Sequence, residues 1–344
     1  IDEAKGDVNR ALDIYYSKPS EIPGEPPGEG RGLSSKSNQV PLCPEACPSQ
    51  ENKNASENSG HAFNVCEQTS TEDIVDNDYV SLPPEQYKPK EHACWRDGQP
   101  APYIHLVRTF ASVEGEKGKI KAMSILCNMF RSLLSFSPED VLPAVYLCTN
   151  KIAADHENIE LNIGGSLISS ALEEACGISR STMREMYNRL GDLGDVAQLC
   201  RQTQKLLVPP PPLLVRDVFS TLRKISVQSG TGSTRQKKNL IVKLMRSCRE
   251  KEIKFLVRTL ARNLRIGAML RTVLSALGRA VVMNSFWNCH NKEPSENCFK
   301  EKLEGVSAAV VEAYNILPSL DVVVPSLMEK DIEFSTSTLS MIPG

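Results

Sequence analysis

Apolar side chains recur every three or four residues through most of the chain beyond residue 102. This spacing places them on one face of an α-helix, since a turn takes about 3.6 residues. A β-branched run at 322–324 is too short to indicate a sheet. The pattern therefore predicts an all-α domain over residues 89–334, with helical segments at 104–111, 120–134, 138–146, 167–176, 183–190, 218–227, 240–264, 270–282 and 306–317.

Two segments with other patterns precede this domain. Residues 1–18 have helical spacing that ends at Lys18-Pro19. Because one amphipathic helix cannot bury its own apolar face, we expect this segment to be the end of a truncated helical module. Residues 19–88 are rich in Pro, Gly, Ser, Asn and Glu and almost lack periodicity. Such a segment buries too little apolar surface to offset its ordering entropy, which predicts a disordered linker.

An internal repeat lies within the helical domain. The sequence Leu-x-Ile-Gly-x-x-Leu occurs at 161–167 and again at 264–270, and each copy leads into a helical pattern. Two copies are too few for a solenoid, which needs at least three stacked units. We expect an irregular multi-helix domain with two pseudo-repeated helix-turn-helix lobes.

The formal net charge of −2 over 344 residues conceals a strong asymmetry. Residues 1–90 carry sixteen acidic against eight basic side chains, a net charge of −8, whereas residues 235–271 carry twelve Lys and Arg against two Glu, a net charge of +10. Stretches of about 18 uninterrupted apolar residues, which a membrane span requires, are absent from the sequence. The basic segment indicates an anionic partner, and no membrane partner is expected.

The 11 cysteines are odd in number, and most are spread at irregular intervals. Small disulfide-bonded scaffolds concentrate their cysteines, so we expect free thiols in a reducing compartment. Cys43, Cys47, Cys66 and His61 lie within one short stretch, but the CxxxC spacing lacks a matching second pair. We therefore expect no metal site, although binding of a metal by these three cysteines stays open.

A glycine-containing turn opens the basic segment. Gly230–Thr234 is followed at once by Arg235, Lys237 and Lys238, and Thr234 is expected to cap a helix there. The free N–H groups and the dipole of a helix start favour an anion, and the adjacent cations strengthen that preference. We predict phosphate contacts from Thr231, Gly232, Ser233, Thr234, Lys237 and Lys238.

A second glycine turn, Arg262–Gly267, precedes a helix expected to begin at Ala268. Glycine lets the backbone approach a phosphate closely because it has no Cβ, and such turns bind sugar and phosphate more than base edges. Arg262, Arg265 and Arg271 would then flank one phosphate track. The alternative is that these cations only face water. Few aromatic side chains interleave with the cations, which favours duplex over single strands.

Signals of catalysis are weak in this chain. The five histidines stand apart and form no metal-binding pair. Asp192 and Asp195 could pair as carboxylates, but capping of helices is the favoured interpretation. Pro209–Pro212 is interpreted as a rigid connector rather than a polyproline ligand. We assign no catalytic residue.

Several ordered motifs resemble one family. The resemblance covers residues 89–344 and is to the N-terminal DNA-binding domain of eukaryotic ATP-dependent DNA ligases. The matching motifs are Lys90–Trp95, Pro102-Tyr103, Arg108–Phe110, Gly194–Ala197, Thr203–Leu206 and Arg265–Gly267.

The resemblance implies an all-α domain that binds the minor groove of nicked double-stranded DNA. The main DNA-contacting stretch of the family falls on Asn263, Leu264, Arg265, Ile266, Gly267, Ala268, Met269, Leu270, Arg271 and Thr272. It also implies a nuclear, monomeric ligase for DNA repair, recombination or replication, whose adenylation and OB domains seal nicks with ATP and Mg²⁺. The adenylating Lys-x-Asp-Gly motif is absent from this sequence, so we expect the chain alone to be inactive and to need no cofactor. Residues 335–344 would begin the linker to the adenylation domain.

An all-α scaffold that binds protein partners through its helical grooves is the alternative function. The DNA-binding hypothesis depends on one expectation, that the cations after Gly230 and the helix starts near Thr234 and Ala268 form one surface.

Overall fold

The computed structural model describes residues 79–204, 208, 210–288 and 296–330. Within these ranges the regular structure is entirely helical, as predicted, and its only extended pairing is an isolated bridge between Pro102 and Leu214. None of the described helices is both long and apolar enough to cross a membrane. The predicted segments 1–18 and 335–344, most of the predicted linker, and the Cys43, Cys47 and Cys66 group lie outside the described residues.

The helices follow the apolar periodicity closely. In chain order they are η2 (Tyr79–Ser81), α2 (Pro89–His92), α3 (Tyr103–Glu114), α4 (Lys119–Phe136), η3 (Pro138–Asp140), α5 (Val141–Cys148), η4 (Asp155–Glu157), α6 (Gly165–Cys176), α7 (Arg180–Leu190), α8 (Leu193–Thr203), α9 (Val215–Ser226), α10 (Ser233–Ser247), α11 (Glu250–Leu260), α12 (Leu270–Asn288), α13 (Glu296–Ile316) and α14 (Leu320–Lys330).

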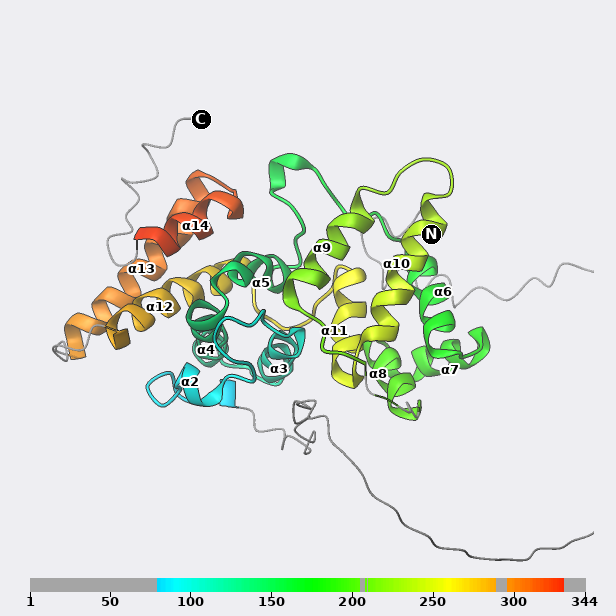
Figure 1. Ribbon diagram of the computed structural model, residues 1–344, viewed down its shortest axis with the longest axis horizontal. Coiled ribbons are helices and arrows are strands. Elements are labelled where there is room, and N and C mark those ends of the chain that lie inside the picture. The colour runs from blue at the N-terminus through cyan, green and yellow to red at the C-terminus, as the bar shows by residue number, and fades with distance from the viewer. Residues whose placement is uncertain (1–78, 205–207, 209, 289–295, 331–344) are drawn as a thin grey trace, which may run out of the picture. The chain divides into compact units, whose positions relative to one another are not determined.

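Two groups of helices flank α3, α4, α5 and α9 (Figure 1). On one side α10 packs against α6, and α11 packs against α8 and α3. On the other side α12 packs between α4 and α13, and α14 lies against α5 and α13. The α12–α13 approach is close at Gly278, where an added Cβ would lie 3.2 Å from Val306 Cγ1.

The two copies of the internal repeat share a backbone feature. The second residue of each copy is in the left-handed region, Asn162 with φ 48° and Arg265 with φ 54°. The first copy leads into α6 and the second into α12, and the two isoleucines, Ile163 and Ile266, are both buried. The repeat is therefore a turn that anchors its isoleucine in the core before a helix starts.

The single helical segment predicted over 240–264 forms two helices in the structure, because the helical backbone is interrupted at Cys248. The Arg201 guanidinium of α8 donates to the Cys248 carbonyl from Nε and Nη2, at 3.0 and 2.7 Å, and to the Arg246 carbonyl at 2.8 Å. The next helix starts where the Glu252 carboxylate accepts from the Arg249 N–H at 2.7 Å. A side chain distant in sequence thus satisfies the carbonyls that end α10.

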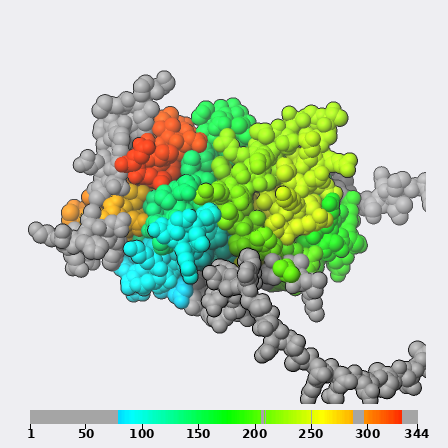
Figure 2. Space-filling model, in the orientation of Figure 1, coloured from blue at the N-terminus to red at the C-terminus, as the bar shows by residue number. Residues whose placement is uncertain are grey.

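The helical domain begins earlier than the predicted boundary at residue 89. Val80 and Tyr87 are buried, and the Tyr87 hydroxyl lies 2.6 Å from Ser132 Oγ of α4. The Asn128 amide donates to the Val80 carbonyl at 3.0 Å, and Arg131 Nη1 donates to the Pro84 carbonyl at 2.6 Å. The first described residues form a continuous surface with the helices that follow (Figure 2). Residues 79–88 therefore belong to the domain rather than to the linker.

Candidate nucleic-acid interface

The first glycine turn places the start of α10 at the surface. Gly230 and Gly232 have φ values of 80° and 83°, which glycine adopts without strain. The helix begins at Ser233 with Gly232 in the capping position, so the cap lies two residues before the predicted cap at Thr234. Thr231, Gly232 and Thr234 are exposed, and Ser233 is half-buried. The turn therefore presents unobstructed backbone, as the sequence indicates.

The three cations that follow this turn have different surroundings. Arg235 is exposed, and the described residues provide it with no ion-pair partner. Lys237 is buried, and its ammonium donates to the carbonyls of Leu161 and Asn162 at 3.3 and 3.4 Å. Lys238 pairs with Glu174 of α6 at 2.9 Å. Among the three, Arg235 is the one most available to an outside anion.

The second turn alternates between core and surface. Leu264 and Ile266 are 6% and 3% exposed, whereas Arg265, Gly267, Met269 and Arg271 are exposed. Of the other predicted contacts, Arg262 is exposed, and Asn263, Ala268, Leu270 and Thr272 are half-buried. The two buried side chains anchor the turn, so Arg265 between them is directed outward.

Left-handed backbone shapes this turn. Arg262 has φ 58°, Arg265 has φ 54° and Gly267 has φ 68°. The first two values are uncommon for a residue with a side chain. An added Cβ at Gly267 would find no heavy atom within 4 Å, so its backbone is open to approach from outside. α12 starts at Leu270, two residues after the predicted start at Ala268.

Arg265 is joined to the core by a buried carboxylate. Its Nη1 lies 3.1 Å from Oδ2 of Asp192, whose side chain is 5% exposed. Asp192 is also the N-cap of α8, and its Oδ1 accepts from the Asp195 N–H at 2.9 Å. The capping role predicted for Asp192 is confirmed, and its second oxygen fixes an arginine of the basic turn.

A charge network continues beneath this contact. Arg258, whose side chain is 4% exposed, donates to Asp192 at 3.0 Å and to Glu114 at 2.8 Å, and Lys254 pairs with Glu114 and Asp195 at 3.0 Å each. Burial alone would raise the pKa of the Glu114 carboxyl, but hydrogen bonds from Arg258 and Lys254 outweigh it, and the pKa lies below its ordinary value. Burial would lower the pKa of Arg258, and these carboxylates raise it instead. Glu114 and Arg258 are therefore stabilised in their charged forms.

Gly194 makes this network possible. An added Cβ there would lie 2.8 Å from Arg258 Cγ, 2.8 Å from the Lys254 carbonyl oxygen and 2.9 Å from Asp192 Oδ1. Real Cβ atoms essentially never approach that closely to backbone. The glycine lets α8 and α11 pack closely enough for Asp192 to reach Arg258.

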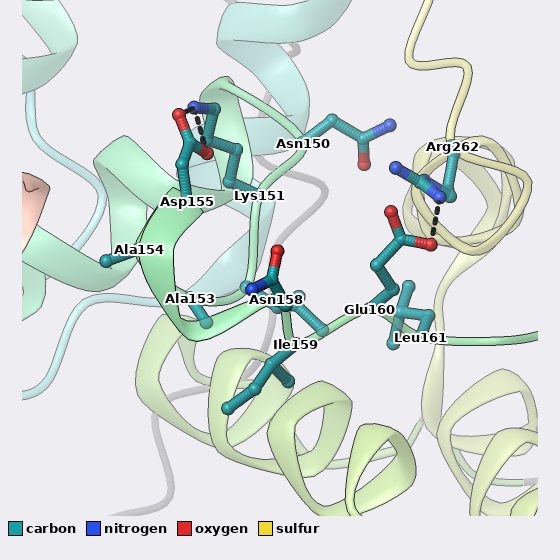
Figure 3. Close-up of a pocket in the computed structure, with 11 residues that line it drawn as sticks. Asn150, Lys151, Ala153, Ala154, Asp155, Asn158, Ile159, Glu160, Leu161 and Arg262 are labelled. Carbon is teal, nitrogen blue, oxygen red and sulfur yellow. Dashed lines mark hydrogen bonds and ion pairs between the residues drawn. The ribbon is translucent and has the colours of Figure 1, made fainter. Parts of the chain in front are cut away.

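Contacts with the first repeat connect the two basic turns. Arg262 Nη1 donates to Glu160 Oε2 at 2.8 Å, and both side chains are about half exposed. Figure 3 shows this pair facing each other beside a pocket that Lys151 and Asp155 also line. The backbone carbonyls of the next two residues, Leu161 and Asn162, accept hydrogen bonds from the Lys237 ammonium. Because three residues span at most about 10 Å, the start of α10 and the Arg262 turn lie near the same segment.

Comparison with known proteins supports the motifs. A family model described as the DNA ligase N terminus matches residues 102–278, from the start of α3 to the middle of α12. The chain belongs to this DNA ligase family.

The most similar relatives compared are DNA ligases by name. The chain is 87% identical to DNA ligase 6 of Arabidopsis thaliana over all 344 residues, which is 25% of that protein. It is 38% identical to DNA ligase 1 of the same plant over 71% of this chain and 30% of that protein, and 35% identical to DNA ligase 1 of Dictyostelium discoideum over 75% of this chain and 22% of that protein. The chain thus spans between 22% and 30% of the length of these relatives.

Sequence patterns miss three supporting elements of this DNA ligase N-terminal domain. They are the Asp192 contact to Arg265, the Glu160 contact to Arg262, and the Leu161 and Asn162 carbonyls that hold Lys237. The shared Gly-Asp-Val-Ala motif offered the best signal for the first, since its glycine allows the close packing beside Asp192. Among the described residues, no group of three or more His, Cys, Asp or Glu side chains is arranged to hold a metal ion.

Proposed function

We propose that this helical domain binds the phosphate backbone of nicked double-stranded DNA within a DNA ligase. The observation that carries the proposal is the segment 262–271, in which Leu264 and Ile266 are buried whereas Arg262, Arg265, Gly267, Met269 and Arg271 are exposed. Three arginines in this short segment favour an anion, and the contacts of duplex-binding turns fall on phosphate and sugar. Binding should therefore depend weakly on base sequence.

Each part of the surface has a distinct role in this proposal. Arg271 supplies a guanidinium that makes no ion pair with any described residue. Arg265 is pre-positioned by Asp192, so little side-chain entropy is lost when it meets a phosphate. The open backbone at Gly267 and at the 230–232 turn lets N–H groups approach phosphate oxygens. The contacts proposed from Thr231 to Thr234 and from the exposed and half-buried residues of 262–272 are retained in this proposal. The side chains of Leu264, Ile266 and Lys237 are buried and support the fold instead.

The activity of the whole protein is also a proposal. We infer that it joins 5′-phosphate and 3′-hydroxyl ends at a nick in the nucleus, as a monomer, during repair, recombination or replication, because its relatives are eukaryotic DNA ligases by name. ATP would supply the adenylyl group that activates the 5′-phosphate, with Mg²⁺ to balance phosphate charge. The described residues offer no metal-binding group, and the sequence has no Lys-x-Asp-Gly motif. We assign that chemistry to the adenylation and OB domains, for which this domain would hold the substrate.

A salt titration of DNA binding tests the proposal. The purified chain is titrated into a fluorescent nicked duplex, and the logarithm of affinity should fall with the logarithm of salt by about 0.9 per phosphate contact. Arg271→Ala should weaken binding to every base sequence and reduce that slope by about one. Arg96→Ala, which removes an exposed arginine near α2, is the matched control and should leave both values unchanged. A salt-independent affinity would contradict the proposal, and capture of a protein partner without DNA would favour the scaffold alternative.

A further inference from the structure

Met269 is an exposed apolar residue inside the basic turn. Its exposed fraction is 77%, equal to the highest value among the exposed large hydrophobic side chains of the described residues. It follows Leu264 and Ile266, which the same segment buries to 6% and 3% exposure. Leu264 and Ile266 therefore make the core contacts of this segment, and the large apolar side chain of Met269 is left in solvent.

The position of Met269 has no evident role in folding. Its carbonyl accepts from the Val273 N–H at 3.1 Å, so it immediately precedes the first turn of α12. Ser, Thr, Asp or Asn at this position would supply a side-chain acceptor for a free N–H group, which a thioether does poorly. Neither core packing nor helix capping explains a methionine here.

The neighbours of Met269 are suited to nucleic acid. Arg265 and Arg271 are exposed on either side of it in the sequence, and the first turn of α12 contains no acidic residue. If Arg265 and Arg271 each bind a phosphate of one strand, an exposed side chain that lies between them in the segment is placed to meet the sugars of that strand. Methionine is flexible and polarisable, which allows it to fit an uneven apolar surface.

We infer that Met269 contacts deoxyribose in the bound strand and gives this surface a preference for DNA over RNA. This inference rests on the proposed function. In DNA the C2′ atom is a methylene, whereas in RNA it carries a hydroxyl, and this hydroxyl allows proteins to distinguish the two. An apolar contact excludes water from the sugar and gives a 2′-hydroxyl no hydrogen-bond partner, which costs free energy. Met269 is thus a specificity-determining residue beside the phosphate-binding arginines.

Binding of two matched duplexes to the purified chain tests this inference. One is a nicked DNA duplex, and the other carries ribonucleotides throughout one strand. Met269→Ala should weaken DNA binding about fivefold, as expected for losing part of one buried apolar side chain, with an unchanged salt slope because no phosphate contact is lost. On the ribonucleotide duplex Met269→Ala should lower the affinity by a smaller factor. The ratio of the affinity for DNA to the affinity for the ribonucleotide duplex should therefore decrease. Met269→Leu, which keeps an apolar side chain of similar size, should retain the preference.

Controls separate this inference from the proposed function. Ile316→Ala removes an equally apolar side chain, 59% exposed at the end of α13, and should change neither affinity. If Arg271→Ala weakens DNA binding while Met269→Ala does not, the sugar contact is wrong and the DNA-binding proposal stands. Equal losses on both duplexes would overturn the sugar preference. If the unaltered chain shows no salt-dependent DNA binding, the proposed function itself fails.

Discussion

The carboxylate of Asp192 joins Arg265, at the surface, to Arg258, in the interior. Its Oδ2 lies 3.1 Å from Arg265 Nη1, and its Oδ1 lies 3.0 Å from Arg258 Nε. The same Oδ1 accepts the Asp195 N–H that starts α8. One side chain thus caps a helix, neutralises a buried arginine and positions an arginine of the basic turn, so the turn is fixed by the core beneath it.

Asp192→Asn should destabilise the domain by about 3 kcal/mol, because Arg258 loses one charged partner in a buried network. The free energy of unfolding is measured by chemical denaturation. Glu160→Gln, which breaks the half-exposed pair with Arg262, is the control and should cost less than about 1 kcal/mol. Equal effects of the two substitutions would show that the Asp192 network does not stabilise the fold.

Gly194→Ala should destabilise the domain by about 2 kcal/mol, because the added Cβ would press on backbone and on Arg258. Gly305→Ala is a matched control in α13, where an added Cβ meets no atom within 4 Å. That substitution should leave stability unchanged or raise it by up to about 1 kcal/mol, since alanine favours the helix. Thermal unfolding of the two variants compares them directly, and a stable Gly194→Ala protein would contradict the close α8–α11 packing.

Lys237→Met should lower stability while leaving the salt slope of DNA binding unchanged. The ammonium of Lys237 is buried against the Leu161 and Asn162 carbonyls, and losing it leaves those acceptors unsatisfied, at a cost of about 1–2 kcal/mol. Arg235→Ala, in the same helix, should instead reduce the salt slope and leave stability unchanged, because Arg235 is exposed. If Lys237→Met reduced the salt slope by about one, Lys237 would be a phosphate contact after all.

His105 should make stability depend on pH below neutrality. Burial lowers the pKa of His105 to about 4 from its ordinary 6.5, and Nε2 lies 3.3 Å from the Met129 carbonyl. Between these two values the unfolded chain binds more protons than the folded one, so stability is lost as pH falls from 6.5 to 4. The loss from this one group is about 3 kcal/mol.

Denaturation curves at several pH values measure this effect. His105→Gln cannot take up a proton, so its stability should fall less steeply over the same window. The difference between the two proteins isolates His105 from the carboxylates, which titrate in both. Parallel pH profiles for the two proteins would show that His105 is not buried in its neutral form.

The sequence alone determined the helical class of the domain and the location of its basic turn. Helical periodicity is a local property, so the stripes at 104–111, 120–134 and 167–176 correspond to α3, α4 and α6. The turn at Arg265–Gly267 can also be predicted from local sequence, because its charged residue, isoleucine and glycine form one short pattern. Family motifs confined to short segments were recognisable for the same reason, and the match to residues 102–278 confirms the family that they indicated.

Tertiary structure decided which charges face outward and where the elements end. Lys237 and Lys238 are adjacent in sequence, yet only Lys237 is buried. Its ammonium packs against two backbone carbonyls that lie 76 and 75 residues away in the sequence, so the sequence around it does not indicate its burial. Arg201 ends α10 from 47 residues away, and residues 79–88 join the domain through contacts with α4. The hydrogen-bond partner of a charged group comes from whichever segment packs beside it. The apolar periodicity of one helix does not show which distant segment packs against it. Packing therefore determines whether a cation supports the fold or faces a ligand.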